Sequence, residues 1–112
     1  MLIKLKGILP VKLKTYFKTF KKFNAYNNLD KKLLKYLNYK NGFYIDVGSY
    51  HPIRLSNTKF LYDKGWQGIN IDISKKSIDL FKIARKSDVN LNIGIGNKNE
   101  YSEAYFQNQI LG

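Results

Sequence analysis

The stretch Phe43-Tyr-Ile-Asp-Val-Gly-Ser49 decides the fold of this chain. It is a short apolar run with a single charge that stops at Gly48, which is typical of a buried strand followed by a turn. Two further runs read as strands, residues 68–73 and residues 88–95. Helical patterns fill the intervals between them. Strand, helix, strand, helix, strand predicts a parallel α/β sheet with right-handed crossovers.

The limits of the two intervening helices follow from their end residues. Ser56 and Ser74 each precede a helical pattern and have side chains that cap helix N-termini well, and Gly65 is a natural stop for the first helix. The run Ser56-Asn-Thr58 could instead contact a ligand, although capping is the simpler role. Trp66 and Phe43 are expected in the core.

Two helices are expected before the sheet. Residues 11–23 place aromatic side chains at helical spacing among lysines, and this stripe could pack on the protein itself or lie on an anionic membrane. Asp30 is expected to cap a second helix that carries Leu33, Leu34 and Leu37 on one face and ends at Asn41-Gly42. Residues 104–106 suggest a short returning strand after the third strand.

The net charge of +12 is concentrated at the N-terminus, because residues 1–40 sum to +10 and residues 41–112 to +2. Of the basic residues only Arg54 and Arg85 are arginines, whereas specific readers of nucleic acid favour Arg. We therefore expect no specific nucleic-acid partner. The chain has no Cys, no signal-peptide pattern and no apolar run long enough for a transmembrane segment, so a cytoplasmic protein is expected.

The carboxyl ends of the first two strands are where a ligand would bind in an open parallel sheet. Gly48 would let a ligand approach the backbone, and Asp72 follows at a spacing suited to ribose hydroxyls. Alternatively, Asp46 is an ordinary polar strand end and Asp72 the partner of a nearby Lys. No second or third Gly follows Gly48, which argues against a dinucleotide and favours a cofactor without phosphates, such as S-adenosylmethionine.

Three motifs occur in order: Gly42-Phe-Tyr-Ile-Asp-Val-Gly-Ser-Tyr-His-Pro52, Leu55-Ser-Asn-Thr58, and Lys64-Gly-Trp-Gln-Gly-Ile-Asn-Ile-Asp72. Over about residues 40–106 the chain resembles the start of the FkbM-type S-adenosylmethionine-dependent methyltransferase domain. The resemblance implies a partial Rossmann-like methyltransferase sheet, with three parallel strands and a short returning strand. It also implies methyl transfer from S-adenosylmethionine to an oxygen of a small-molecule or sugar acceptor.

The resemblance further implies roles for individual residues. Asp46, Gly48 and Ser49 would line the methionine side of the cofactor, and Asp72, where the family commonly has Glu, would hold the ribose. No catalytic residue and no metal ligand is assigned. His51 could act as a general base or could be an exposed turn residue, and the second interpretation is favoured.

The family domain continues beyond the strands seen here. We therefore expect a basic helical arm over residues 1–40 and, over residues 41–112, the N-terminal half of a methyltransferase domain, as a fragment or an inactive remnant. An alternative is a basic module that binds nucleic acid or an anionic membrane. In the family's strand order 3-2-1-4, Phe43, Ile45 and Val47 would form an unpaired apolar edge, which predicts self-association.

Overall fold

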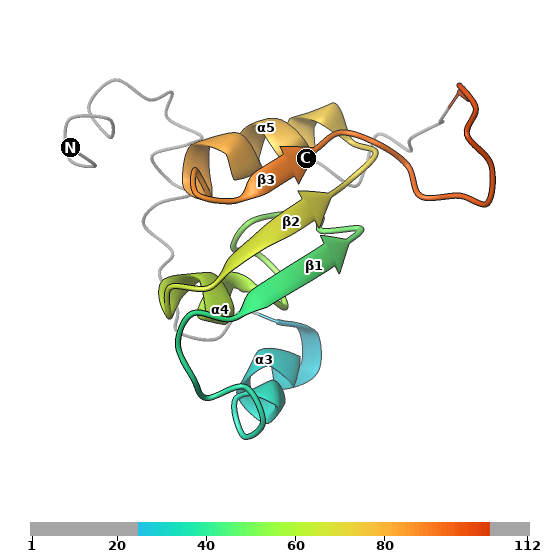
Figure 1. The fold of residues 1–112 in the computed structure, drawn as a ribbon. Helices are drawn as coiled ribbons and strands as arrows, with labels where there is room; N and C mark the ends of the chain where they lie inside the picture. The colour runs from blue at the N-terminus through green and yellow to red at the C-terminus, as the bar shows by residue number, and fades with distance from the viewer. Residues whose placement is uncertain (1–24, 104–112) are drawn as a thin grey trace.

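The computed structural model describes residues 25–103, and it contains the expected three-stranded parallel sheet. The strands are β1 (Phe43–Val47), β2 (Gln67–Ile71) and β3 (Val89–Leu91), arranged in the order β1-β2-β3 (Figure 1). Ile45 lies opposite Ile69, which in turn lies opposite Val89. The chain is therefore an α/β protein, and β2, the second strand along the chain, is the central strand of the sheet.

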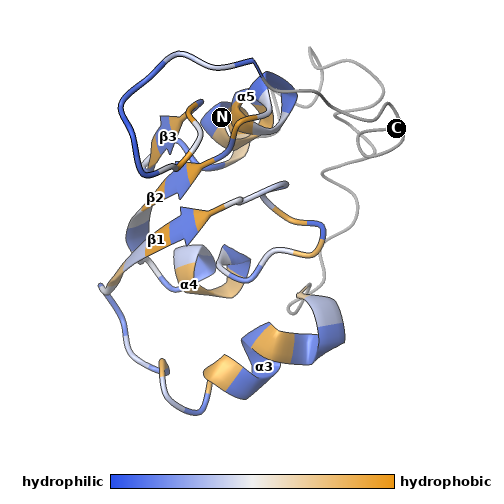
Figure 2. Cartoon of the chain, turned by 90° about the vertical axis from the view of Figure 1, so that its right-hand side faces the viewer, coloured by the Kyte–Doolittle hydropathy of each residue, from blue (hydrophilic) through white to orange (hydrophobic). Residues whose placement is uncertain are grey.

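Two helices cover one face of this sheet, α4 (Lys59–Asp63) and α5 (Lys75–Ala84), and Figure 2 shows both on the same side of the strands. The Ser74 hydroxyl accepts a hydrogen bond from the Ser77 N–H, so the predicted cap of α5 is confirmed. The N-cap position of α4 is Thr58 rather than the predicted Ser56, but Ser56 Oγ accepts from the N–H groups of Thr58 and Lys59 and so holds the turn that leads into the helix. Gly65, with φ of +89°, follows the end of α4 as expected.

The helix before the sheet differs from the prediction. A 3-10 turn, η1 (Tyr26–Asn28), leads into α3 (Leu29–Leu33), which is only five residues long and ends well before Asn41. Asp30 is not its cap but lies inside it, and its buried carboxylate accepts from the backbone N–H groups of Ala25 and Lys31. Asp30 therefore fixes the entry of the chain into α3. The predicted helix over residues 11–23 lies outside the described residues.

The core forms where β1, α4 and the start of β2 meet. Tyr44, Phe60, Leu61 and Trp66 are buried together, and Leu33, Leu34 and Leu37 pack against them, so the predicted apolar face of this segment is confirmed. Trp66 is a core residue as expected, and its indole N–H donates to the Tyr39 carbonyl at 2.7 Å.

Gly68 is required by this core, because a Cβ there would lie 2.2 Å from the Tyr44 ring. The ring therefore packs directly against the backbone of β2, a contact that only a residue without a side chain allows.

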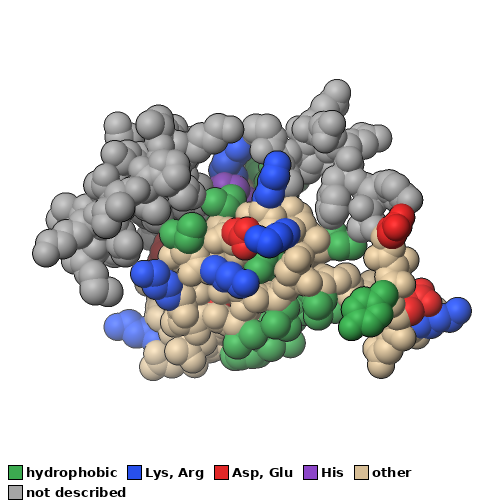
Figure 3. Space-filling view, turned by 90° about the horizontal axis from the view of Figure 1, so that it is seen from above, with side chains coloured by type: hydrophobic (Ala, Val, Ile, Leu, Met, Phe, Trp, Pro, Cys, Tyr) green, Lys and Arg blue, Asp and Glu red, His purple; other side chains and the backbone are tan. Residues whose placement is uncertain are grey.

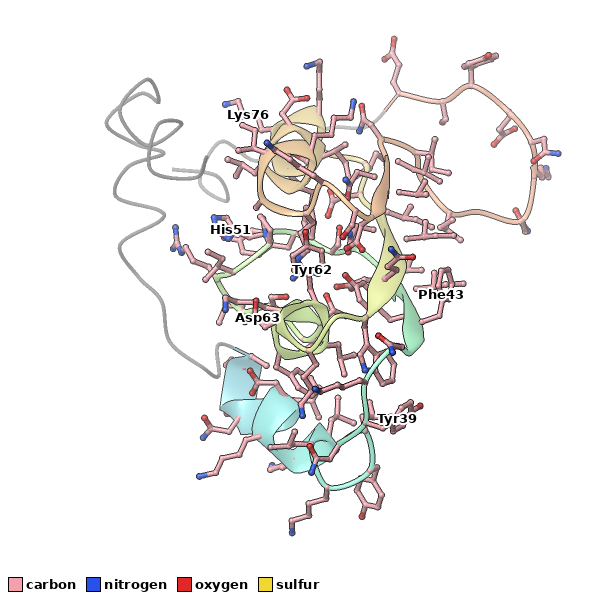
Figure 4. All side chains as sticks on the ribbon, turned by 60° about the vertical axis from the view of Figure 1, so that its left-hand side comes forward. Tyr39, Phe43, His51, Tyr62, Asp63 and Lys76 are labelled. Carbon is pink, nitrogen blue, oxygen red and sulfur yellow. The ribbon has the colours of Figure 1, made fainter. Side chains whose placement is uncertain are left out.

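The opposite face of the sheet is apolar and bare over the described residues. Phe43 was expected in the core, and this was wrong: its side chain is 61% exposed and points away from the side that carries His51 and Tyr62 (Figure 4). Successive side chains of a strand point to opposite faces, so Ile45 and Val47 share the exposed side with Phe43. Val89 and Leu91 extend this surface onto β3, and Figure 3 shows apolar side chains gathered along the lower side of the view.

The third strand is shorter than predicted, and ordered polar contacts replace the rest of it. After Leu91 the Asn92 side chain donates to the carbonyls of Asp72 and Ile73 at 3.0 and 2.9 Å. The returning strand over residues 104–106 lies outside the described residues. Within residues 25–103 no helix has the length and apolarity needed to cross a membrane.

The bare face predicts self-association of residues 1–112. Unprotected apolar sheet surfaces and unpaired strand edges seek partners, so the protein should elute from a size-exclusion column above its monomer mass of 13.1 kDa. Ile45→Lys should shift the distribution toward monomer without unfolding the domain, because the side chain is already exposed. Lys76→Gln, on exposed α5 surface, is the matched control and should change nothing; a monodisperse wild-type monomer would contradict the expectation.

Candidate functional site at the carboxyl edge of the sheet

The loop after β1 is folded back onto the end of β2. Gly48 has φ of +70°, and the N–H groups of Gly48 and Ser49 both donate to the Ile71 carbonyl, at 2.9 and 3.1 Å. The Ser49 hydroxyl lies 3.3 Å from the same oxygen and is buried. These bonds hold the turn against the end of β2, and among the described residues no atom outside Gly48 and its chain neighbours lies within 4 Å of a Cβ built at Gly48.

Asp72 ties this loop to the start of α5. One carboxylate oxygen accepts from the Tyr50 N–H at 2.8 Å, and the other accepts from the Ser74 N–H at 2.7 Å. The prediction that Asp72 stands at the end of β2 is close to the structure, since β2 ends one residue earlier. Its partners are backbone amides rather than a neighbouring Lys.

Asp46 lies on the helix-facing side of β1 and is half-buried. Its Oδ2 accepts a hydrogen bond from the Thr58 hydroxyl at 2.8 Å. Burial raises the pKa of the Asp46 carboxyl, the Thr58 hydrogen bond and the Arg85 charge lower it, and the nearby Asp72 charge raises it. The structure thus brings Asp46, Gly48, Ser49 and Asp72 to one edge of the sheet.

Arg85, at the C-terminal end of α5, is buried behind this edge with 1% of its surface exposed. One terminal nitrogen donates to the Tyr44 hydroxyl at 3.0 Å and to Thr58 Oγ1 at 2.8 Å. The other donates to the Pro52 carbonyl at 2.8 Å and to Ser56 Oγ at 2.9 Å. Arg85 therefore connects α5 to β1, to the loop after β1 and to the start of α4.

The negative charge that accompanies Arg85 is Asp88, 4.0 Å away and also buried. Asp88 accepts hydrogen bonds from the Tyr44 hydroxyl, from the Gly68 N–H at 2.9 Å and from the Asn70 amide at 2.9 Å. Burial, the largest cause, raises the pKa of Tyr44 above its ordinary value, so its hydroxyl keeps its proton. The helix-facing side of the sheet is consequently a hydrogen-bonded polar layer.

His51 is not an exposed turn residue, and that expectation was wrong. Its ring is buried, with 8% of the residue exposed, and Nδ1 accepts from the N–H groups of Ile53 and Arg54 at 3.1 and 2.8 Å. Burial and, to a smaller extent, the Arg54 charge lower the pKa of His51 to about 4. Because Nδ1 is occupied by two backbone donors, His51 acts here as a structural acceptor that shapes the loop after β1.

Sequence reasoning missed Arg85, Asp88 and the role of Thr58. A signal for Arg85 existed, since it is one of two arginines in a chain that otherwise uses Lys. Among residues 25–103 no three side chains of His, Cys, Asp or Glu come together as a metal site. No family model, curated protein or solved structure matches the chain.

Replacing Arg85 tests the buried network. Arg85→Met should lower the free energy of unfolding by about 3–5 kcal/mol, because it removes one partner of a buried ion pair and leaves Asp88 uncompensated. The exposed neighbour provides the matched control, since Lys86→Met should stay within about 0.5 kcal/mol of wild type in urea unfolding. Equal effects of the two substitutions would show that Arg85 does not organise the fold.

The protonation of His51 should couple to stability. The pKa of His51 in the folded state, about 4, lies below the ordinary value of 6.5. Between these pH values His51 is therefore protonated in the unfolded chain but neutral in the folded protein. The urea midpoint should therefore fall as the pH is lowered from 6.5 toward 4, and the slope should flatten in His51→Gln. Nitrogen-15 NMR at pH 5.5 should show a neutral ring with the hydrogen on Nε2; a charged ring at that pH would refute the assignment.

Proposed function

We propose that the carboxyl edge of this sheet binds S-adenosylmethionine and that the chain takes part in methyl transfer of the FkbM type. The observation that carries the proposal is the convergence of Gly48, Asp46 and Asp72 at the ends of adjacent parallel strands. Ligands of open α/β sheets bind at this edge. When bound, S-adenosylmethionine supplies an electrophilic methyl group on a sulfonium centre.

The open position at Gly48 supports this assignment. A side chain there would be strained by φ of +70°, and the space that a Cβ would point into holds no atom of the other described residues, chain neighbours aside, within 4 Å. A ligand can therefore approach the backbone closely. The loop that presents Gly48 is already held by its bonds to Ile71 and Asp72, so little ordering would accompany binding.

Asp72 retains capacity for a ligand although it has two backbone partners. An ionised carboxylate offers about four lone-pair positions, and the N–H groups of Tyr50 and Ser74 occupy two of them. The remaining positions suit two adjacent hydroxyls, such as those of a ribose. The same backbone bonds fix the orientation of the carboxylate, which is what a preorganised binding group needs.

The charge at this edge also suits the methyl donor. The charge of Asp72 raises the pKa of the Asp46 carboxyl, so the edge is electronegative when both carboxyls are ionised. A ligand with a sulfonium and an ammonium group would relieve that repulsion, whereas a pyrophosphate would increase it. The acceptor of the methyl group, a small molecule or a sugar in the resembling family, is not assigned to particular residues.

Calorimetry with S-adenosylmethionine and S-adenosylhomocysteine tests the proposal directly. Wild-type protein should bind saturably, and Asp72→Ala should weaken binding by about 1–3 kcal/mol through loss of charge-assisted hydrogen bonds. Asp79→Ala, which removes an exposed carboxylate from α5, is the matched control and should bind as wild type does. Thermal unfolding of each variant separates lost contacts from lost structure, and unchanged affinity in Asp72→Ala would remove Asp72 from the site.

A further inference from the structure

The hydrogen bonds that link Arg85, Thr58 and Asp46 have a fixed direction. A guanidinium can only donate, so in the 2.8 Å contact with Arg85 the Thr58 oxygen must be the acceptor. The hydroxyl has a single hydrogen, and it is left to point at Asp46 Oδ2, which also lies 2.8 Å away. Thr58 is thereby set as a donor toward the carboxylate of Asp46.

This arrangement is held by its surroundings. Arg85 is anchored at the same time by Pro52 and Ser56, and it is almost completely buried. Thr58 is also buried, with 8% of its surface exposed, so its hydroxyl has no ready exchange with solvent. Asp46 is the outermost member and reaches the edge of the sheet. A rigid, buried pair therefore orients a half-buried carboxylate.

The two oxygens of Asp46 are consequently unequal. Oδ2 is taken by Thr58, whereas Oδ1 accepts no hydrogen bond from the part of the chain that the structure describes. We propose that Thr58 is a positioning residue that, held by Arg85, fixes Asp46 so that Oδ1 faces the cationic end of the bound ligand. This inference rests on the proposed function, since the ligand is the methyl donor and the cationic end is its sulfonium or ammonium group.

The charges around Asp46 give this arrangement a measurable consequence. The groups that act on it come from three directions: Thr58 at the start of α4, Arg85 at the end of α5, and Asp72 beyond β2. Thr58 and Arg85 lower the pKa of Asp46, opposing burial and Asp72. Loss of the Thr58 hydroxyl should therefore raise the pKa of Asp46 further and reduce the fraction of the anion available to a cation.

The experiment uses the full chain and two readouts. Thr58→Val keeps the shape and removes the hydroxyl, Thr58→Ser restores it, and Asn57→Ala alters the exposed neighbour as a control. Carbon-13 NMR follows the titration of the Asp46 carboxyl, and calorimetry follows S-adenosylhomocysteine. We expect Thr58→Val to raise the pKa of Asp46 and to weaken binding roughly tenfold, with both restored in Thr58→Ser and unchanged in Asn57→Ala.

The two readouts keep the inference and the proposed function apart. An unchanged Asp46 titration in Thr58→Val would overturn the positioning role, whatever the ligand does. If wild type binds neither S-adenosylmethionine nor S-adenosylhomocysteine, the proposed function fails, and the inferred ligand role of Oδ1 fails with it. If Thr58→Val does not fold, Thr58→Ala provides the same deletion with less bulk, and its Asp46 titration decides the question.

Discussion

The buried guanidinium of Arg85 is the constraint on which the rest of this structure depends. A charge that is buried away from water must be paired and hydrogen-bonded, because otherwise its desolvation strongly destabilises the folded state. Arg85 satisfies this requirement with partners from separate segments of the chain: Tyr44 on β1, Pro52 in the loop after it, and Ser56 and Thr58 before α4. Those segments are held in one geometry because each supplies an acceptor that the same cation needs.

The sheet consequently has an unusual division between its faces. Parallel sheets are normally apolar on both sides because helices cover both. Here the side beneath α4 and α5 presents Asp46, Asn70 and the hydroxyl of Tyr44, while the side with Phe43 and Val47 is apolar and exposed in the described residues. A hydrogen-bonded polar layer and an apolar surface that the described residues leave uncovered therefore lie back to back, separated by one layer of strands.

Much of the architecture was accessible from the sequence, because it depends on local signals. Apolar runs gave the three strands, and Ser74 and Gly65 marked helix ends through their own backbone preferences. The placement of Gly48 and Asp72 at the carboxyl edge followed from strand order. Phe43 was misplaced because an apolar run alone does not say which alternate residues face the helices, and here a Tyr and an Asp do so.

The remainder could not be read from the sequence because it depends on contacts distant along the chain. Arg85 is hydrogen-bonded to Tyr44, 41 residues away in the sequence, and Asp88 to Gly68, 20 residues away. From their neighbours His51 looked like an exposed turn residue and Asp30 like a helix cap, yet both are buried acceptors of backbone N–H groups. No periodicity marks such residues, since their burial depends on which partners the fold brings to them.

The buried cation also limits how the gene can vary. Eighteen lysines against two arginines is a composition typical of AT-rich coding sequence, in which a single G-to-A transition turns an AGA codon into AAA and Arg into Lys. At exposed positions that change is nearly silent. At codon 85 it would replace a planar group with four hydrogen-bonding contacts by a single ammonium that cannot span Tyr44, Thr58, Pro52 and Ser56 together. At position 85, therefore, a lysine could not take over the structural role of the arginine.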